Sequence, residues 1–145
     1  MSVRQITVEQ ARQCMEAHED VVYIDVRTPM EFEKGHPPGA INIPVAFPNP
    51  HTRQMMENPD FLKIVEKHVP KARKVIVGCQ MGGRSQLAAE FMAGAGYADV
   101  SNMQGGFGGA RNPMEGVAVP GWVQLGYDVE TEAASGARYE ELQRF

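Results

Sequence analysis

Short apolar runs alternate along the whole chain with segments that carry apolar residues at helical spacing. Runs that are apolar at nearly every position and rich in β-branched residues are typical of parallel strands buried on both faces. Such runs predict strands at residues 21–26 and 74–78, and we also expect short strands at residues 40–44 and 100–103. Helical spacing predicts helices at residues 8–18, 29–34, 59–68 and 84–95. Strands and helices that alternate in this way predict an α/β fold with a mainly parallel sheet and helices on both faces.

Two of the predicted helices begin at a capping box, in which a Ser/Thr residue and a Glu/Gln residue three positions later bond each other's backbone N–H groups. Thr7 and Gln10 form the first pair. Thr28 and Glu31 form the second, and that helix also has proline at its first position. Gly96 is the predicted C-cap of the helix at residues 84–95.

The stretch at residues 45–58 gives the weakest pattern, because prolines interrupt its periodicity. Within it we expect a helical piece over residues 51–57. The charged segment at residues 137–145 predicts a short terminal helix.

A length of 145 residues fits one domain with a single substantial core. Hydrophobic residues make up 43% and charged residues 22%, which is ordinary for a globular protein and argues against disorder. The formal net charge of −4 provides no basic patch, so we expect neither nucleic acid nor an anionic membrane as a partner. The first residues lack the apolar core of a signal peptide, and no apolar run approaches the ~20 residues of a membrane span. We therefore expect a soluble, cytoplasmic protein.

The two cysteines, Cys14 and Cys79, are too few for a disulfide scaffold and do not form a C-x-x-C pair. Cys14 falls inside a predicted helix and is expected to be a small packing residue. The histidines are scattered without metal-ligand spacing, so we expect no metal site. These exclusions leave Cys79 as the expected centre of the chemistry.

Cys79 stands where the strand at residues 74–78 ends, and the glycine-rich turn after it leads into a helix. A thiol in this place faces unpaired backbone N–H groups and the positive end of a helix dipole, which both favour an anion. Gly82 and Gly83 allow the N–H groups of residues 80–84 to curl around the sulfur as an anion-binding nest. We therefore expect a readily ionised, nucleophilic thiolate.

Two roles stay open for Arg84, which follows the glycines. Its guanidinium can supply positive charge for an anionic substrate, or it can turn inward and pair with the carboxylate of Asp25 or Glu31. The sequence does not decide between these roles. Asp25 and Arg27 are expected to hold the cysteine loop in place rather than to react.

Three separated pieces of the chain together resemble a single-domain rhodanese, a protein of the thiosulfate sulfurtransferase type. The pieces are Tyr-Ile-Asp-Val-Arg at 23–27 with the Gly-His-Pro-Pro-Gly turn at 35–39, the loop at 79–84, and Gly105-Gly106 with Gly121-Trp122. Each piece alone is weak evidence for this family, but the combination of the three pieces in this order is specific to it. The resemblance implies a rhodanese-like domain over residues 1–130 with a five-stranded, mainly parallel sheet, and a C-terminal tail over residues 131–145.

The resemblance also implies a two-step transfer of sulfur. Cys79 attacks the outer sulfur of thiosulfate or a similar donor, and the persulfide then passes its sulfur to cyanide or to a thiol, protein thiols included. No metal or organic cofactor is required. The residues expected to bind substrate are Gln80, Met81, Gly82, Gly83, Arg84 and Ser85, and those expected to support the loop are Asp25, Arg27 and Glu31.

The sequence departs from the shorter members of this family by an extra stretch at residues 107–120, between the double glycine and Trp122. In the implied fold this stretch starts at the carboxyl ends of the strands, where open α/β sheets bind ligands. It either forms a wall of the active site that helps to choose the sulfur acceptor, or is an ordinary surface insertion.

Two other functions remain as alternatives. Cysteine-dependent phosphatases and arsenate reductases also place a cysteine and an arginine around a helix N-terminus. The related phosphatases have five residues between the two, whereas four separate Cys79 from Arg84, and the shorter loop favours a single sulfur atom over a tetrahedral phosphate. A non-catalytic rhodanese-type binding or regulatory module is the other alternative, and the presence of the cysteine argues against it.

Overall fold

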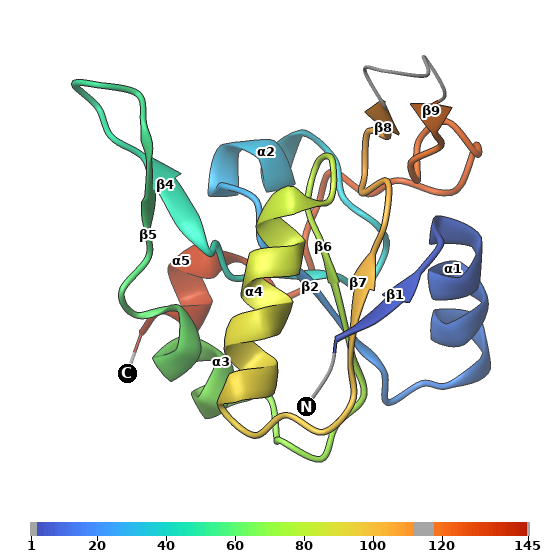
Figure 1. Ribbon diagram of the computed structural model, residues 1–145, viewed down its shortest axis with the longest axis horizontal. Helices are drawn as coiled ribbons and strands as arrows, with labels where there is room; N and C mark the ends of the chain where they lie inside the picture. The colour runs from blue at the N-terminus through green and yellow to red at the C-terminus, as the bar shows by residue number, and fades with distance from the viewer. Residues whose placement is uncertain (1–2, 112–117, 145) are drawn as a thin grey trace.

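The computed structural model describes residues 3–111 and 118–144 (Figure 1). Its centre is a five-stranded sheet with the spatial order β1-β7-β6-β2-β3, in which every neighbouring pair is parallel. The strands are β1 (Arg4–Ile6), β2 (Val22–Asp25), β3 (Ile41–Asn42), β6 (Val75–Gly78) and β7 (Val100–Met103). The predicted α/β fold and five-stranded parallel sheet are confirmed.

The sheet separates two apolar clusters, because successive side chains of a strand point to opposite faces. Ile24 and Val77 belong to one cluster, which also contains Phe61 and Met92, while Tyr23 and Ile76 belong to the other. The helices are α1 (Val8–Ala17), α2 (Pro29–Lys34), α3 (Phe61–His68), α4 (Gly83–Gly94) and α5 (Tyr139–Leu142). Figure 1 shows α1 on one side of the sheet and α3, α4 and α5 on the other.

The register of the central strands brings the functional segments together. Asp25 at the end of β2 lies opposite Gly78 at the end of β6, so the residues after each strand emerge side by side. Cys79 follows one of these ends and Arg27 follows the other. The sheet therefore positions side by side two of the three segments on which the resemblance rests.

The helix ends follow the predicted signals closely. Both capping boxes are present, between Thr7 and Gln10 and between Thr28 and Glu31. The prediction of Gly96 as C-cap of α4 is wrong by one residue: Ala95 is the C-cap, and Gly96 follows it with a φ of +103°. Glycine is suited to that position because it adopts positive φ without steric cost.

The helical piece predicted over residues 51–57 is wrong. This stretch belongs to an antiparallel hairpin formed by β4 (Ala46–Pro48) and β5 (Met55–Glu57). The Asn49 side chain accepts hydrogen bonds from the backbone N–H groups of His51 and Thr52, at 2.8 and 3.2 Å. Such local side-chain bonds favour a turn over a helix.

The predicted insertion at residues 107–120 contains a second small antiparallel pair, β8 (Ala110–Arg111) and β9 (Ala118–Val119). Residues 112–117 of the predicted insertion lie outside the described residues. The pair lies at the end of the sheet where β6 and β7 terminate (Figure 1).

The predicted terminal helix is present as α5 and packs on the domain. Leu142 is 4% exposed and belongs to the same cluster as α3 and α4. The backbone N–H of Asn42 donates to the carbonyl of Ala137 at 2.8 Å, and Asn58 Nδ2 donates to the Tyr139 hydroxyl at 3.1 Å. Residues 137–142 therefore contribute to the core.

An ion pair joins α2 to α4. Arg84 donates two hydrogen bonds to the carboxylate of Glu31, at 2.7 and 3.0 Å. Burial opposes ionisation of Glu31, but the hydrogen bonds from Arg84 and from the Thr28 backbone outweigh it and lower the pKa of Glu31 to about 2.

No helix in residues 3–111 and 118–144 is both long and apolar enough to cross a membrane.

Leu142→Ala is expected to lower the free energy of unfolding by about 2–4 kcal/mol, because it removes a buried side chain and leaves a cavity. Urea unfolding followed by Trp122 fluorescence measures the loss. Gln143→Ala, at the exposed neighbouring position, is the control and should change stability by less than about 0.5 kcal/mol. Equal effects of the two substitutions would show that α5 does not stabilise the core.

Glu31 predicts a specific acid dependence of stability. Its pKa is lower in the folded protein, about 2, than the ordinary 4.5, so its contribution is complete above pH 4.5 and is lost as the pH falls towards 2. In Glu31→Gln the free energy of unfolding should therefore fall less steeply over this range than in the wild type. Glu33→Gln, on the same helix and 3.6 Å from Arg138 in a more exposed pair, should keep the wild-type slope.

Candidate active site

Cys79 follows the last residue of β6, and its sulfur is enclosed by the turn that begins there. The side chain is 2% exposed. The backbone N–H of Gly82 donates to Sγ at 3.0 Å, and the Ser85 hydroxyl lies 3.3 Å from it. A backbone N–H and a hydroxyl thus converge on one sulfur atom, as expected for part of an anion-binding nest.

The shape of this turn depends on Gly82. Its φ is +114°, in the left-handed region that side chains rarely adopt, and α4 begins at the next residue, Gly83. The left-handed residue turns the chain sharply from the strand end into the helix, which directs the Gly82 N–H at the sulfur. The predicted role of glycine in the turn is thus confirmed at position 82.

A second close approach lies behind the cysteine, at Gly78. A Cβ atom there would lie 1.8 Å from the hydroxyl oxygen of Tyr23. Tyr23 is fully enclosed, and its burial, reinforced by the charge of Asp25, raises its pKa well above 10.0. The neutral phenol therefore lies beside the strand end that carries Cys79.

Arg27 and Asp25 form a buried ion pair that reaches the cysteine loop. The guanidinium donates to both carboxylate oxygens at 2.7–3.1 Å and to the carbonyl of Gly35 at 2.6 Å. It also donates to Gln80 Oε1 at 3.1 Å and lies 4.5 Å from the centre of the Phe107 ring. Burial opposes the charge of Arg27, but the hydrogen bonds to Asp25 outweigh it and raise its pKa. The hydrogen bond from Arg27 to Gln80 fits the expectation that Arg27 holds the cysteine loop in place.

The structure decides between the two orientations of Arg84. Its guanidinium pairs with Glu31, and the hydrogen bonds to that carboxylate raise the pKa of Arg84. The side chain remains 25% exposed. Arg84 therefore turns to Glu31 rather than to Asp25, which is occupied by Arg27.

The double glycine allows the segment after β7 to lie directly on the cysteine loop. A Cβ atom on Gly106 would lie 2.5 Å from the carbonyl oxygen of Cys79, and one on Gly105 would lie 2.7 Å from the carbonyl oxygen of Pro120. The N–H of Phe107 donates to the Cys79 carbonyl at 2.7 Å. Side chains at 105 and 106 would separate the two segments.

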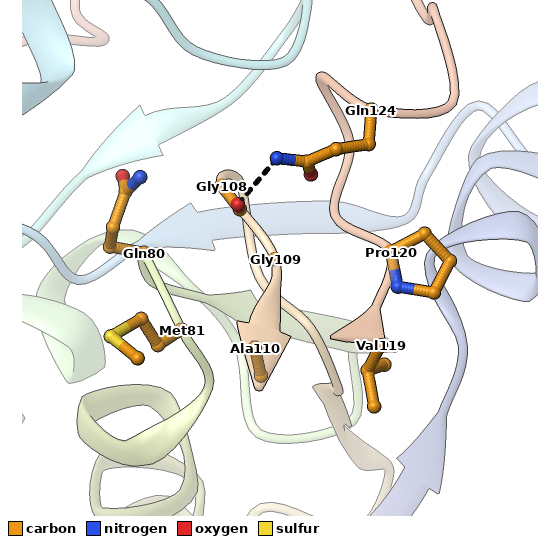
Figure 2. A pocket seen from close by; sticks show the side chains of 8 residues that line it. All are labelled: Gln80, Met81, Gly108, Gly109, Ala110, Val119, Pro120 and Gln124. Atoms are coloured by element: carbon orange, nitrogen blue, oxygen red, sulfur yellow. Dashed lines mark hydrogen bonds between the residues drawn. The ribbon is translucent and has the colours of Figure 1, made fainter. Parts of the chain in front are cut away.

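A cavity of about 450 Å³ lies between the cysteine loop and the insertion (Figure 2). Its lining residues are Gln80, Met81, Gly108, Gly109, Ala110, Val119, Pro120 and Gln124. Gln124 Nε2 donates to the Gly108 carbonyl at 2.7 Å and holds one edge of this cavity. The described part of the insertion therefore forms a wall of the cavity beside the loop, as one of the two sequence-based alternatives expects.

Asn102 is a residue near the sulfur that the sequence analysis missed. It is 4% exposed, and the Ser85 hydroxyl donates to its Oδ1 at 2.5 Å. An amide side chain inside a strand predicted to be buried, here at residues 100–103, was the available signal.

Two further residues, Cys14 and Trp122, are packed within the domain. Cys14 is half-buried on α1, and Trp122 is a 3%-exposed packing residue whose Nε1 donates to the Asp128 carbonyl at 2.7 Å. Across residues 3–111 and 118–144, no three His, Cys, Asp or Glu side chains are grouped closely enough to hold a metal ion.

Comparison with known proteins assigns the chain to a family. Residues 7–112 match the model of the rhodanese-like domain. Thiosulfate sulfurtransferase 16, chloroplastic, of Arabidopsis thaliana is 46% identical over 85 residues, which are 59% of this chain and 69% of that protein. The protein named sulfurtransferase from Allochromatium vinosum is 31% identical over 104 residues, which are 72% of this chain and 84% of that protein. In several further relatives the match spans less than half of the relative's length.

Solved structures agree with this assignment. The crystal structure of Rv0390 from M. tuberculosis matches with a TM-score of 0.73 and 25% identity, over 91% of this chain and 100% of that one. The sheet, the cysteine loop and the matched sequence lead to one conclusion: the chain belongs to the rhodanese-like domain family.

Proposed function

We propose that this protein is a sulfurtransferase that carries sulfane sulfur as a persulfide on Cys79. The observation that carries the proposal is the convergence of the Gly82 N–H and the Ser85 hydroxyl on Sγ, at 3.0 and 3.3 Å. The Gly82 N–H stabilises an anionic sulfur, as does the Ser85 hydroxyl once it donates to the sulfur, and the near-complete burial of the side chain protects a persulfide from water. The sulfurtransferase names of two relatives support the same reaction class.

The proposed cycle has two displacements at sulfur. The Cys79 thiolate attacks the outer sulfur of thiosulfate or a similar donor, the S–S bond of the donor breaks, and sulfite leaves with the bonding electron pair. The acceptor, cyanide or a thiolate, then attacks the outer sulfur of the persulfide, and Cys79 leaves as a thiolate. The cycle needs no metal or organic cofactor.

The loop backbone has the main role in attracting an anionic donor. Arg27 and Arg84, the two arginines nearest the loop, are each paired with a carboxylate, on Asp25 and Glu31. Their positive charges are therefore largely balanced within the fold. Met81, at 60% exposure, and Gln80 both line the large cavity and lie next to Cys79 in the chain, so we place the acceptor there.

The first test is direct. Purified protein mixed with thiosulfate and cyanide should produce thiocyanate, and mass spectrometry should find one added sulfur on Cys79. Cys79→Ala should reduce both signals to background, while Cys14→Ala should retain wild-type activity. Full activity in Cys79→Ala would refute the mechanism. Phosphatase turnover that is absent from Cys79→Ser would favour the phosphatase alternative instead.

The second test concerns the cavity as the acceptor site. Val119→Trp should fill part of it and raise the KM for a bulky thiol acceptor roughly fivefold, a loss of ~1 kcal/mol of binding. The rate of persulfide formation from thiosulfate should not change. Val123→Trp is the matched control, because Val123 is 47% exposed and is not among the lining residues. An equal rise in KM in both variants would show that the acceptor binds elsewhere.

A further inference from the structure

A chain of hydrogen-bonded side chains runs from the cysteine sulfur to the protein surface. Ser85 Oγ lies 3.3 Å from Cys79 Sγ and donates to Asn102 Oδ1 at 2.5 Å. Asn102 Nδ2 donates to Gln5 Oε1 at 2.9 Å, and Gln5 Nε2 donates to Gln86 Oε1 at 2.5 Å. The chain crosses from α4 to β7 and β1 and then returns to α4.

The single hydroxyl proton of Ser85 fixes the direction of this chain. Ser85 Oγ has three neighbours that can accept a hydrogen bond: Cys79 Sγ at 3.3 Å, the Gly82 carbonyl at 3.1 Å and Asn102 Oδ1 at 2.5 Å. The shortest contact is to Asn102, whose Oδ1 faces Ser85 because its Nδ2 is directed at Gln5. Ser85 therefore presents a lone pair to the sulfur, which suits a thiol S–H and not a thiolate.

We propose that Asn102 is a positioning residue, whose side-chain amide sets the direction of the Ser85 hydroxyl and reverses it when the sulfur becomes anionic. This inference rests on the proposed function of Cys79. When the S–H proton has left to solvent, the Asn102 amide turns over, so that its Nδ2 donates to Ser85 Oγ and Ser85 donates to the anionic sulfur. Gln5 and Gln86 turn in the same sense, so each donor again faces an acceptor.

The surroundings give the amides room for this rotation. Gln5, Gln86 and Asn102 line a cavity of about 390 Å³ beside the cysteine loop, which also touches Gly82. Gln5 is exposed and Gln86 half-buried. The oxygen and nitrogen ends of a side-chain amide have nearly the same size, so the reversal requires little other movement.

The other titratable groups around Cys79 lie outside this hydrogen-bonded chain of side chains. Tyr23, Asp25 and Arg27 approach from β2 and the segment that follows it, with Asp25 and Arg27 paired to each other. Arg84 on α4 is paired with Glu31 on α2. Substitutions at Asn102 leave all these groups in place, so a change in the ionisation of Cys79 reports on the hydrogen bonds that run from Ser85 through Asn102.

Two substitutions at Asn102 should act in opposite directions. The absorbance of the thiolate at about 240 nm, followed against pH in a Cys14→Ala background and corrected with Cys79→Ala, gives the midpoint of ionisation. Asn102→Asp offers only acceptor atoms, so it should keep the Ser85 proton away from sulfur and raise the midpoint by about half a pH unit or more. Asn102→Leu removes the nearer of the two acceptors that compete with the sulfur and leaves the Gly82 carbonyl at 3.1 Å, so Ser85 should donate to the sulfur more often and the midpoint should fall by a similar amount.

Combination with Ser85→Ala separates positioning from structural damage. The shift caused by Asn102→Leu should disappear in the Ser85→Ala background. Ser101→Ala should leave the midpoint unchanged, because Ser101 is a buried neighbour on β7 whose hydroxyl has no hydrogen-bond partner among the described residues. Shifts of the same sign in both Asn102 variants, or a Leu shift that persists without Ser85, would overturn the proposal.

Gln5, which follows Asn102 in the series of hydrogen-bonded side chains, provides a second test of the proposal. If the Asn102 variants do not fold, Gln5→Leu, at an exposed position, should still lower the midpoint, because it removes the acceptor that directs Asn102 Nδ2 away from Ser85. An unchanged midpoint in Gln5→Leu would then refute the proposal. The titration uses no sulfur donor, so its outcome is separate from a failure of persulfide formation, which would refute the proposed function.

Discussion

The buried guanidinium of Arg27 connects the segments that form the site. It is paired with Asp25 at the end of β2, and it also donates to the Gly35 carbonyl and to Gln80 in the cysteine loop. Its other face lies on the ring of Phe107. Removing a partner from a buried charge is strongly destabilising, because the remaining charge stays out of water without compensation. The relative positions of the loop, the turn before β3 and the insertion therefore depend on this one cation.

Much of the fold could be predicted because the responsible signals are local. The β2 and β6 strands are continuous apolar runs, and the boxes at Thr7 and Thr28 involve residues three positions apart. The hairpin of β4 and β5 could not be predicted from periodicity, since the side-chain bonds of Asn49 direct its turn. Strand β1 was missed because three residues carry little pattern and their pairing with β7 is distant in sequence.

The site was only partly predictable for the same reason. The turn after Cys79 follows from its glycines, but the orientation of Arg84 depends on the carboxylate of Glu31 on α2, which lies 53 positions away in sequence. Asn102 was missed although it is a polar residue in a buried strand. Its hydrogen bond to Ser85 requires the alignment of β7 beside β6, which no local pattern contains.

These constraints separate the cysteine loop from the cavity wall that we propose as the acceptor site. The backbone of Cys79 is fixed by the N–H of Phe107, and Gly106 leaves no space for the loop to move towards the segment after β7. The nearby arginines are already paired with carboxylates. Little in the loop can therefore be changed without loss of its geometry. The wall contributed by β8 and β9 carries none of these bonds to Arg27 or to the sulfur in its described residues, so differences in acceptor can arise there while the chemistry at Cys79 stays the same.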